Sequence, residues 1–217
     1  MMHDVVEKCR AVAVELLEHC VKQVPDPCPL LPGLVPALLQ RMGQLPVQEP
    51  AEEVRLSLVR LLAACVDRAP GKELGGHAAD FTTVLCRALE DGFPDIKRLA
   101  CSTCACLAAR APPGSLSPHS GKLVATLVVN LGHQHAKVRC AVLEALDPLL
   151  AYDAVPSGSV TDVVAPGLKP LAHDRAPAVR EVLFRTLAGW LGAGRGPGQP
   201  GPPPDGQLGG AASGKEA

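Results

Sequence analysis

The amino-acid sequence predicts an all-α protein folded as an α-solenoid, in which antiparallel helix pairs stack into one elongated array. The main observation is a fourfold recurrence of an aliphatic residue followed by Arg or Lys, at intervals of 42, 42 and 41 residues. Each recurrence opens an amphipathic run, and Leu, Val and Ala can fill the core of a chain with only 2% aromatic residues. Such a period is typical of helical repeats, because one helix pair cannot bury its apolar face until a neighbour stacks on it. The recurring residues are Val54 and Arg55, Ile96 and Lys97, Val138 and Arg139, and Val179 and Arg180.

The predicted array has five units, of which the first is partial. Its single helix has apolar residues at helical spacing and is interpreted as the second helix of a repeat. Each later unit has a first helix, a turn, and a second helix that begins near a recurring pair. Proline-rich turns separate the units, because proline has no amide hydrogen to donate and restricts the residue before it. The units cover residues 1–24, 30–67, 77–110, 119–151 and 160–191, with helices expected over 4–24, 30–42, 52–67, 77–90, 94–110, 119–131, 137–151, 160–172 and 178–191.

Two stretches depart from this regular pattern. Residues 67–76 are expected to form a turn between units, and the first helix of the last unit carries Pro166, Gly167 and Pro170. These residues should kink or shorten that helix. The repeat domain is expected over residues 4–191, without polar capping repeats at its ends. The Gly/Pro-rich tail over 192–217 has no aliphatic periodicity and is expected to be disordered, because it cannot bury enough surface to offset the entropy of ordering.

The basic member of each recurring pair has two interpretations. The aliphatic member should point into the core, while the Arg or Lys stands at a turn where Asp91, Asp95 or Asp174 can meet it. A positive charge is not favoured at a helix N-terminus, so its recurrence there suggests pairing along the stack. One interpretation is a structural ladder of ion pairs worth about 0–1 kcal/mol each. The other is a basic ridge that grips an acidic partner. We favour the ladder, because any repeat of this class is expected to have one.

Composition excludes several classes of partner and places the chain in the cytoplasm. A net charge of -1 and the scarcity of aromatic residues argue against nucleic-acid binding. No run approaches the ~20 apolar residues of a membrane span, and the N-terminus does not resemble a secretory signal. The nine cysteines are expected to be free thiols in a reducing compartment.

Candidate catalytic and metal-binding residues are few. Cys101, Cys104 and Cys106 form the one metal-like cluster, but structural zinc needs four ligands, and these cysteines fit better as small packing residues of a helix. Motifs for phosphate binding, nucleotide binding, hydrolase and metalloprotease activity are absent. We therefore predict no enzymatic activity, no cofactor, no metal and no small-molecule substrate.

Three residues are candidate partner contacts. His133 and His135 flank Gln134 in a turn; they have no accompanying nucleophile, so capping roles or surface contacts are favoured over catalysis. Trp190 and Phe184 fit core or end-of-stack packing. If no helix follows them, however, Trp190 and Leu191 would be left partly exposed as an association patch.

The sequence around the recurring pairs also resembles a known family. The aliphatic–basic turn at this period is typical of HEAT repeats, whose helix pairs form a right-handed superhelical stack. More closely, EDGFPDIKRLACSTCACLA and HQHAKVRCAVLEAL resemble the HEAT-repeat dynein axonemal assembly factor family, over residues 4–191. The resemblance implies a cytoplasmic scaffold for preassembly of outer and inner dynein arms. It also implies contacts with dynein intermediate chains, other assembly factors and chaperones.

The sequence therefore predicts a non-catalytic scaffold that holds dynein subunits while they fold or associate. The alternative is a generic HEAT-repeat interaction scaffold of the transport-receptor or phosphatase-scaffold type, with other clients. The two share the repeat period and differ in the proteins they bind.

Overall fold

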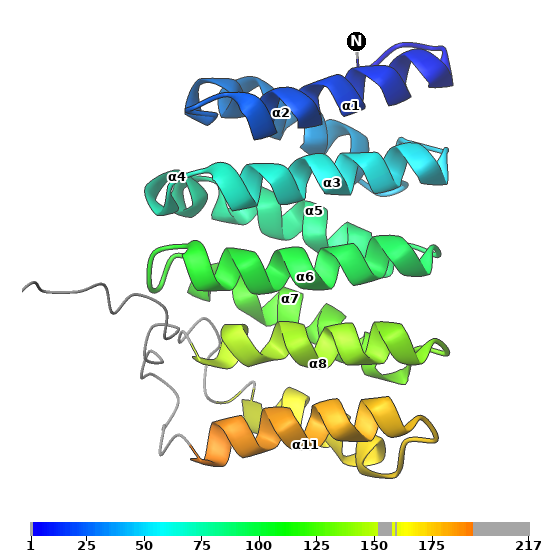
Figure 1. Ribbon diagram of the computed structural model, residues 1–217, viewed down its shortest axis with the longest axis vertical. Helices are drawn as coiled ribbons and strands as arrows, with labels where there is room; N and C mark the ends of the chain where they lie inside the picture. Colours follow the sequence, from blue (N-terminus) through cyan, green and yellow to red (C-terminus); the bar gives the residue numbers. More distant parts are fainter. Residues whose placement is uncertain (1, 152–157, 159, 193–217) are drawn as a thin grey trace, which may run out of the picture.

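A computed structural model describes the backbone of residues 2–151, 158 and 160–192. The described part is built from helices alone and forms a stack of antiparallel helix pairs, which confirms the predicted α-solenoid (Figure 1). The second helices of the successive units form one layer along the stack. They are α1 (Glu7–Gln23), α3 (Glu52–Arg68), α6 (Pro94–Arg110), α8 (Ala136–Ala151) and α11 (Pro177–Gly192).

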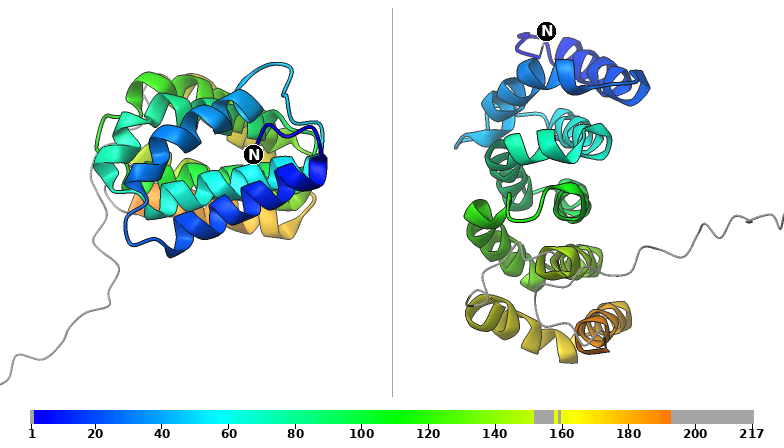
Figure 2. Two further views of the ribbon diagram at one scale, coloured as in Figure 1. Left: turned by 90° about the horizontal axis from the view of Figure 1, so that it is seen from above. Right: turned by 90° about the vertical axis from the view of Figure 1, so that its left-hand side faces the viewer.

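The first helices form the other layer, as the side view in Figure 2 shows. Two of them are regular helices, α5 (Ala78–Glu90) and α7 (Ser117–Val129), and α7 runs into the 3-10 turn η3 (Asn130–Gly132). The first helix of the leading pair is composite: the 3-10 turn η1 (Cys28–Leu30), the helix α2 (Leu31–Leu38) and the π-helical turn η2 (Leu39–Gly43).

The first helix of the last pair is broken into three short pieces. These are a π-helical turn η4 (Val160–Val164), a single α-turn α10 (Ala165–Leu168) and a 3-10 turn η5 (Lys169–His173). Pro166 and Pro170 each fall at the start of a piece, where a missing amide hydrogen costs least. The prolines therefore divide the helix rather than merely bending it.

One helix was not expected from the sequence. Residues 71–76 form the short helix α4 (Gly71–Gly76), where we had predicted only a turn between units. Its Leu74 side chain is fully buried, so packing against the stack, rather than the glycine-rich local sequence, favours the helical turn. The expected tail beyond Gly192 lies outside the described residues.

The core runs between the two layers for the whole length of the stack. Val54, Ile96, Val138 and Val179, the aliphatic members of the recurring pairs, are all at least 98% buried. Each of these side chains begins the buried stripe of a second helix. The repeat period therefore corresponds to one layer of core packing per helix pair.

Candidate functional site

At several repeat turns, an arginine joins its own unit to the next. The Arg139 guanidinium donates from Nε and Nη2 to both carboxylate oxygens of Asp174, at 2.7 Å each. Its Nη1 donates to the carbonyls of His133 and Gln134 in its own turn. Both side chains of this pair are more than 90% buried. The hydrogen bond from Arg139 is the main reason that the pKa of Asp174 is lowered.

The same geometry occurs at two further positions, and we call the three pairs the arginine ladder. Arg55 binds both oxygens of Asp91, at 2.7 and 3.2 Å, and Arg10 binds both oxygens of Glu49, at 2.9 and 2.8 Å. Burial raises the pKa of Glu49, but hydrogen bonds from Arg10 and Arg41 outweigh it, and the pKa is lowered. Sequence reasoning missed the Arg10 pair, because Cys9 stands where the other turns have an aliphatic residue.

The acid of each ladder pair occupies a fixed place. It lies six residues before the Arg or Lys of its own turn, and its carboxylate accepts a hydrogen bond from the backbone amide two residues later. We call residues at this place turn acids. They are Asp4, Glu49, Asp91 and Asp174, and the fourth unit has His133 there instead. This spacing is the sequence signal that would have located the ladder.

The ladder is interrupted at Lys97. Its ammonium group is buried and donates to the carbonyl of Leu89 and to Oδ1 of Asn130, rather than to a carboxylate. Burial lowers the pKa of Lys97. The turn acid that would face it is replaced by His133, whose Nδ1 accepts the amide hydrogen of His135. The pKa of His133 is lowered by burial first and then by the charge of Lys97.

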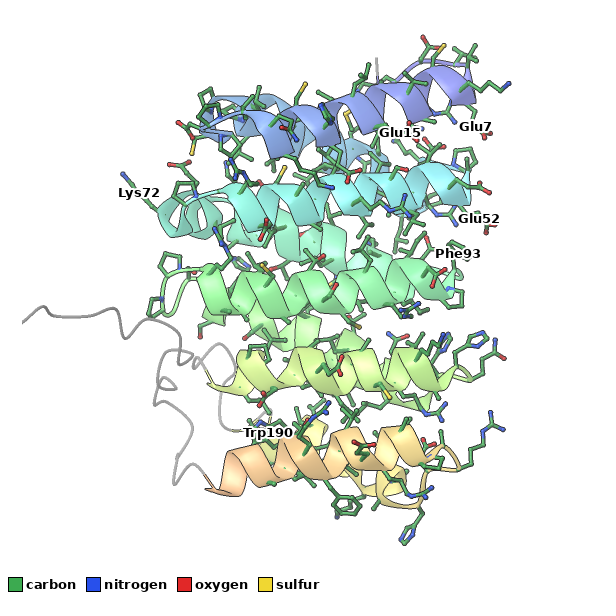
Figure 3. All side chains as sticks on the ribbon, viewed as in Figure 1. Glu7, Glu15, Glu52, Lys72, Phe93 and Trp190 are labelled. Carbon is green, nitrogen blue, oxygen red and sulfur yellow. The ribbon has the colours of Figure 1, made fainter. Side chains whose placement is uncertain are left out.

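The remaining candidate residues lie apart from one another. His135 is exposed in the turn before α8, whereas Trp190 is half-buried and donates from Nε1 to Asp147 of α8, at 2.6 Å (Figure 3). Phe184, not Trp190, is the exposed aromatic residue of α11, and the Leu191 side chain is outside the described part.

The cysteine cluster lies within α6, and Cys106, its third member, is only half-buried. Cys101 and Cys104 are fully buried, and burial raises the pKa of Cys101 to about 12 and also raises that of Cys104 well above its usual value. Such thiols stay protonated, whereas a metal ligand must be a thiolate. Among the residues that the structure describes, no three His, Cys, Asp or Glu side chains are grouped to hold a metal ion.

An open groove of about 680 Å³ crosses the second helices of four successive units. It lies on the layer turned to the viewer in Figure 1, and its walls come from α3, α6, α8 and α11. The lining residues are Leu56, Arg60, Asp95, Arg98, Leu99, Ser102, Ala136, Lys137, Cys140, Ala141, Glu144 and Ala178. Sequence reasoning missed this surface, because its residues come from helices that only the stacking brings together.

Both carboxylates that line the groove form ion pairs with arginines. Asp95 accepts from Arg98 at 2.8 Å, and Glu144 lies 3.5 Å from Arg185. Neither Arg60 nor Lys137 has a carboxylate within ion-pairing distance among the described residues. The groove therefore presents an apolar floor with two unpaired positive charges at separate helices.

Comparison with known proteins identifies the family. Residues 1–194 match the family described as "Dynein axonemal assembly factor 5-like, TPR repeats". The chain belongs to this family. Relatives named "Dynein axonemal assembly factor 5" are 36% identical in Mus musculus, 35% in Homo sapiens and 34% in Xenopus laevis, each over 88% of this chain. The chain spans 22% of the length of each of these relatives.

Solved structures agree with the fold of this family member. A designed armadillo repeat protein in complex with the peptide (KR)4 has a TM-score of 0.67 at 13% identity, covering 86% of this chain and 77% of that one. An engineered protein has the same TM-score at 18% identity, covering 86% and 74%. The 41- to 42-residue spacing of the helix pairs is in the range of HEAT and armadillo repeats. No helix in the described residues is both long and apolar enough to cross a membrane.

Proposed function

We propose that this chain is a non-catalytic scaffold that acts in the cytoplasmic preassembly of axonemal dynein arms. The family membership supports an assembly role, and the groove across α3, α6, α8 and α11 supports binding of another protein. The groove is the observation that supports how a client protein would be bound. A surface built from several repeats can hold an extended segment along the stack, with each repeat contacting a few of its residues.

The charges of the groove indicate what kind of segment fits. Arg60 on α3 and Lys137 on α8 are the unpaired cations, and apolar side chains such as Leu56 and Leu99 lie between them. An extended client segment with acidic residues separated by apolar ones would satisfy both features. Charges placed this way favour the correct partner and its rate of association more than they add affinity. The designed armadillo repeat protein of similar fold, by contrast, was solved with a basic peptide.

The proposed clients are dynein intermediate chains, with other assembly factors and chaperones as further partners. Holding an unassembled subunit in an extended groove would shield its association surface until its partner arrives. This role needs no covalent chemistry. Burial is the main reason that the pKa of Cys140, the cysteine that lines the groove, is raised.

Affinity purification of the tagged chain from ciliating cells tests the proposal. We expect dynein chains or dynein assembly factors to be enriched over a tag-only control. Recovery of transport receptors or phosphatase subunits in their place would contradict it and would favour the generic scaffold. Recovery of no dynein-related protein above the control would also contradict it.

A further inference from the structure

The turns that precede the second helices lie along one edge of the stack, which we call the turn edge. Figure 3 labels two residues there, Glu52 at the start of α3 and Phe93 in the turn before α6. Because the stack brings equivalent positions of successive turns together, a difference between units becomes a difference in charge along this edge. The position directly before the buried aliphatic residue changes from acidic to basic along α3, α6 and α8; its residues are Glu53, Asp95 and Lys137.

The turn edge is acidic at α3 and α6. Glu52 and Glu53 are exposed in the first turn of α3 and have no ion-pair partner among the described residues. Asp95 is exposed in the first turn of α6, where it pairs with Arg98. Acids in a first turn offset the partial positive charge of a helix N-terminus. An anionic ligand is therefore disfavoured on this half of the edge.

The turn edge is basic at α8. Lys137 lies in the first turn of α8, which contains no acidic residue. His135 directly precedes this helix, and Arg175 reaches it from the next turn, with Nη2 3.4 Å from the carbonyl oxygen of Gln134. Lys137, His135 and Arg175 are exposed, and among the described residues none of them has a carboxylate within ion-pairing distance. We call these three residues the basic turn.

His133 adds a hydrogen-bond donor beside the basic turn. Its Nδ1 accepts the amide hydrogen of His135 at 3.1 Å, so the neutral ring carries its own hydrogen on Nε2. The centroids of the two imidazole rings are 5.4 Å apart. Asp174, which precedes Arg175 in the chain, already has both carboxylate oxygens bound by Arg139. This part of the edge therefore offers donors and positive charge to an anionic group.

The basic turn is continuous with the groove. Lys137 belongs to both, since it lines the groove together with Ala136. The apolar groove residues Leu99 and Leu56 lie on α6 and α3, which follow from α8 in the direction of α1. A peptide segment that leaves the groove across Lys137 therefore reaches the basic turn.

We propose that the basic turn anchors a run of acidic residues in a bound peptide segment, whose carboxylates contact Lys137, His135 and Arg175. The acids at α3 and α6 fix the place of this anchor, because they repel the same ligand from the other half of the turn edge. The inference rests on the proposed function in one respect: the apolar residues next to the acidic run lie in the groove. It adds a direction, with the acidic end of the client at α8 and its apolar part running toward α3.

Fluorescence anisotropy of a labelled hexaglutamate peptide, titrated with the full chain, tests the anchor. We expect saturable binding that weakens as salt is added, and no binding of a hexalysine peptide. His135→Glu combined with Arg175→Glu should weaken hexaglutamate binding by roughly tenfold or more, since two attractive contacts become repulsive. Neither residue lines the groove, so this loss reports on the basic turn alone.

His19→Glu combined with Lys72→Glu is the matched control. It makes the same change in charge at exposed positions, and Figure 3 shows Lys72 at the opposite edge of the stack. The control should bind hexaglutamate as the parent does, and circular dichroism should show that both double variants keep their helices. Absence of hexaglutamate binding, equal binding of hexalysine, or equal loss in both double variants would overturn the proposal. Displacement of the peptide by an equal concentration of inorganic phosphate would also overturn it, because the site would then be one for a small anion.

The anchor and the proposed function can fail separately. Hexaglutamate binding that depends on the basic turn, without recovery of dynein chains from ciliating cells, would support the anchor and contradict the proposed function. Hexaglutamate binding that persists in the His135→Glu and Arg175→Glu double variant would overturn the anchor and leave the proposed function standing.

Discussion

At the residue scale, the ladder pairs differ from ordinary surface ion pairs in burial and in geometry. Arg55 and Asp91 form two hydrogen bonds, and their side chains are only 17% and 4% exposed. Arg98 and Asp95 form one hydrogen bond, with both side chains about half exposed. Bidentate, partly buried pairs leave an unpaired charge behind when one partner is lost. The two aspartates therefore allow a matched comparison.

Asp91→Asn should lower the free energy of unfolding by about 1–3 kcal/mol, because Arg55 loses its charged partner in a buried setting. The asparagine side chain can still accept the hydrogen bond from the amide of Phe93, so the turn itself is preserved. Asp95→Asn is the control and should cost less than about 0.5 kcal/mol. Urea denaturation of both variants measures the difference. Equal losses would show that the ladder pair contributes no more than a surface pair.

The interruption of the ladder at His133 predicts a stabilising substitution. His133→Asp places a carboxylate at the turn-acid position, where it can pair with the buried ammonium group of Lys97. The free energy of unfolding should rise by about 0.5–1.5 kcal/mol, since a buried charge gains an opposite charge. His135→Asp, two residues later and exposed, is the control and should give no such gain. If both variants unfold at the same urea concentration as the parent, Lys97 does not face this position.

His133 also predicts a pH dependence of stability. Its pKa in the folded chain is lowered, by burial first and then by Lys97, His135 and Arg139, so folding favours the neutral imidazole. The unfolded chain then binds a proton first as the pH falls below about 6.5, and stability declines from there downward. His133→Gln should flatten this part of the profile, because glutamine cannot take up the proton. A thermal-melting series between pH 5 and pH 8, taken as a rough window around the histidine pKa, measures the slope. An unchanged slope in His133→Gln would contradict this assignment.

At the element scale, the sequence was sufficient to predict the helices that follow the repeating pattern. It was insufficient to predict contacts between residues that are far apart in the sequence. The aliphatic–basic recurrence located the second helices, because the core repeats once per unit. It did not predict α4, whose Leu74 is held by packing. It also did not predict that Lys97 binds Asn130, because these residues lie in different units and meet only after stacking. The groove could not be predicted for the same reason.

The broken first helix of the last unit permits close packing at Gly167. A Cβ atom added there would lie 2.7 Å from Cγ1 of Val128 and 3.2 Å from Cδ1 of Leu131, so the piece α10 can lie close to α7 only with glycine. Gly167→Ala should therefore destabilise the chain by about 1–3 kcal/mol through overpacking. Gly121→Ala in α7, where nothing lies within 4 Å, should be neutral or stabilising. Combining Gly167→Ala with Val128→Ala should recover part of the loss in a denaturation experiment. A Gly167→Ala variant as stable as the parent would contradict the packing argument.

At the scale of the whole molecule, the residues that stabilise the stack differ from those that line the proposed binding groove. The recurring arginines lie between units, where Arg55 and Arg139 bind a carboxylate of the next turn and Arg139 also binds carbonyls of its own turn. The unpaired cations that face the groove, Arg60 and Lys137, lie elsewhere on the second helices. The residues that repeat most regularly therefore hold the stack together, and less regular residues carry the proposed binding.

The groove charges provide the most direct test of the proposed function. Arg60→Glu combined with Lys137→Glu reverses both unpaired cations, which are exposed and should not affect folding. Lys72→Glu combined with Lys169→Glu is the matched control, with the same change in charge at exposed positions outside the groove. The measurement is quantitative mass spectrometry of proteins purified with each tagged variant from ciliating cells. We predict that dynein chains recovered with the parent and the control fall by roughly fivefold or more with the groove variant. Equal recovery of dynein chains with all three proteins would contradict the account.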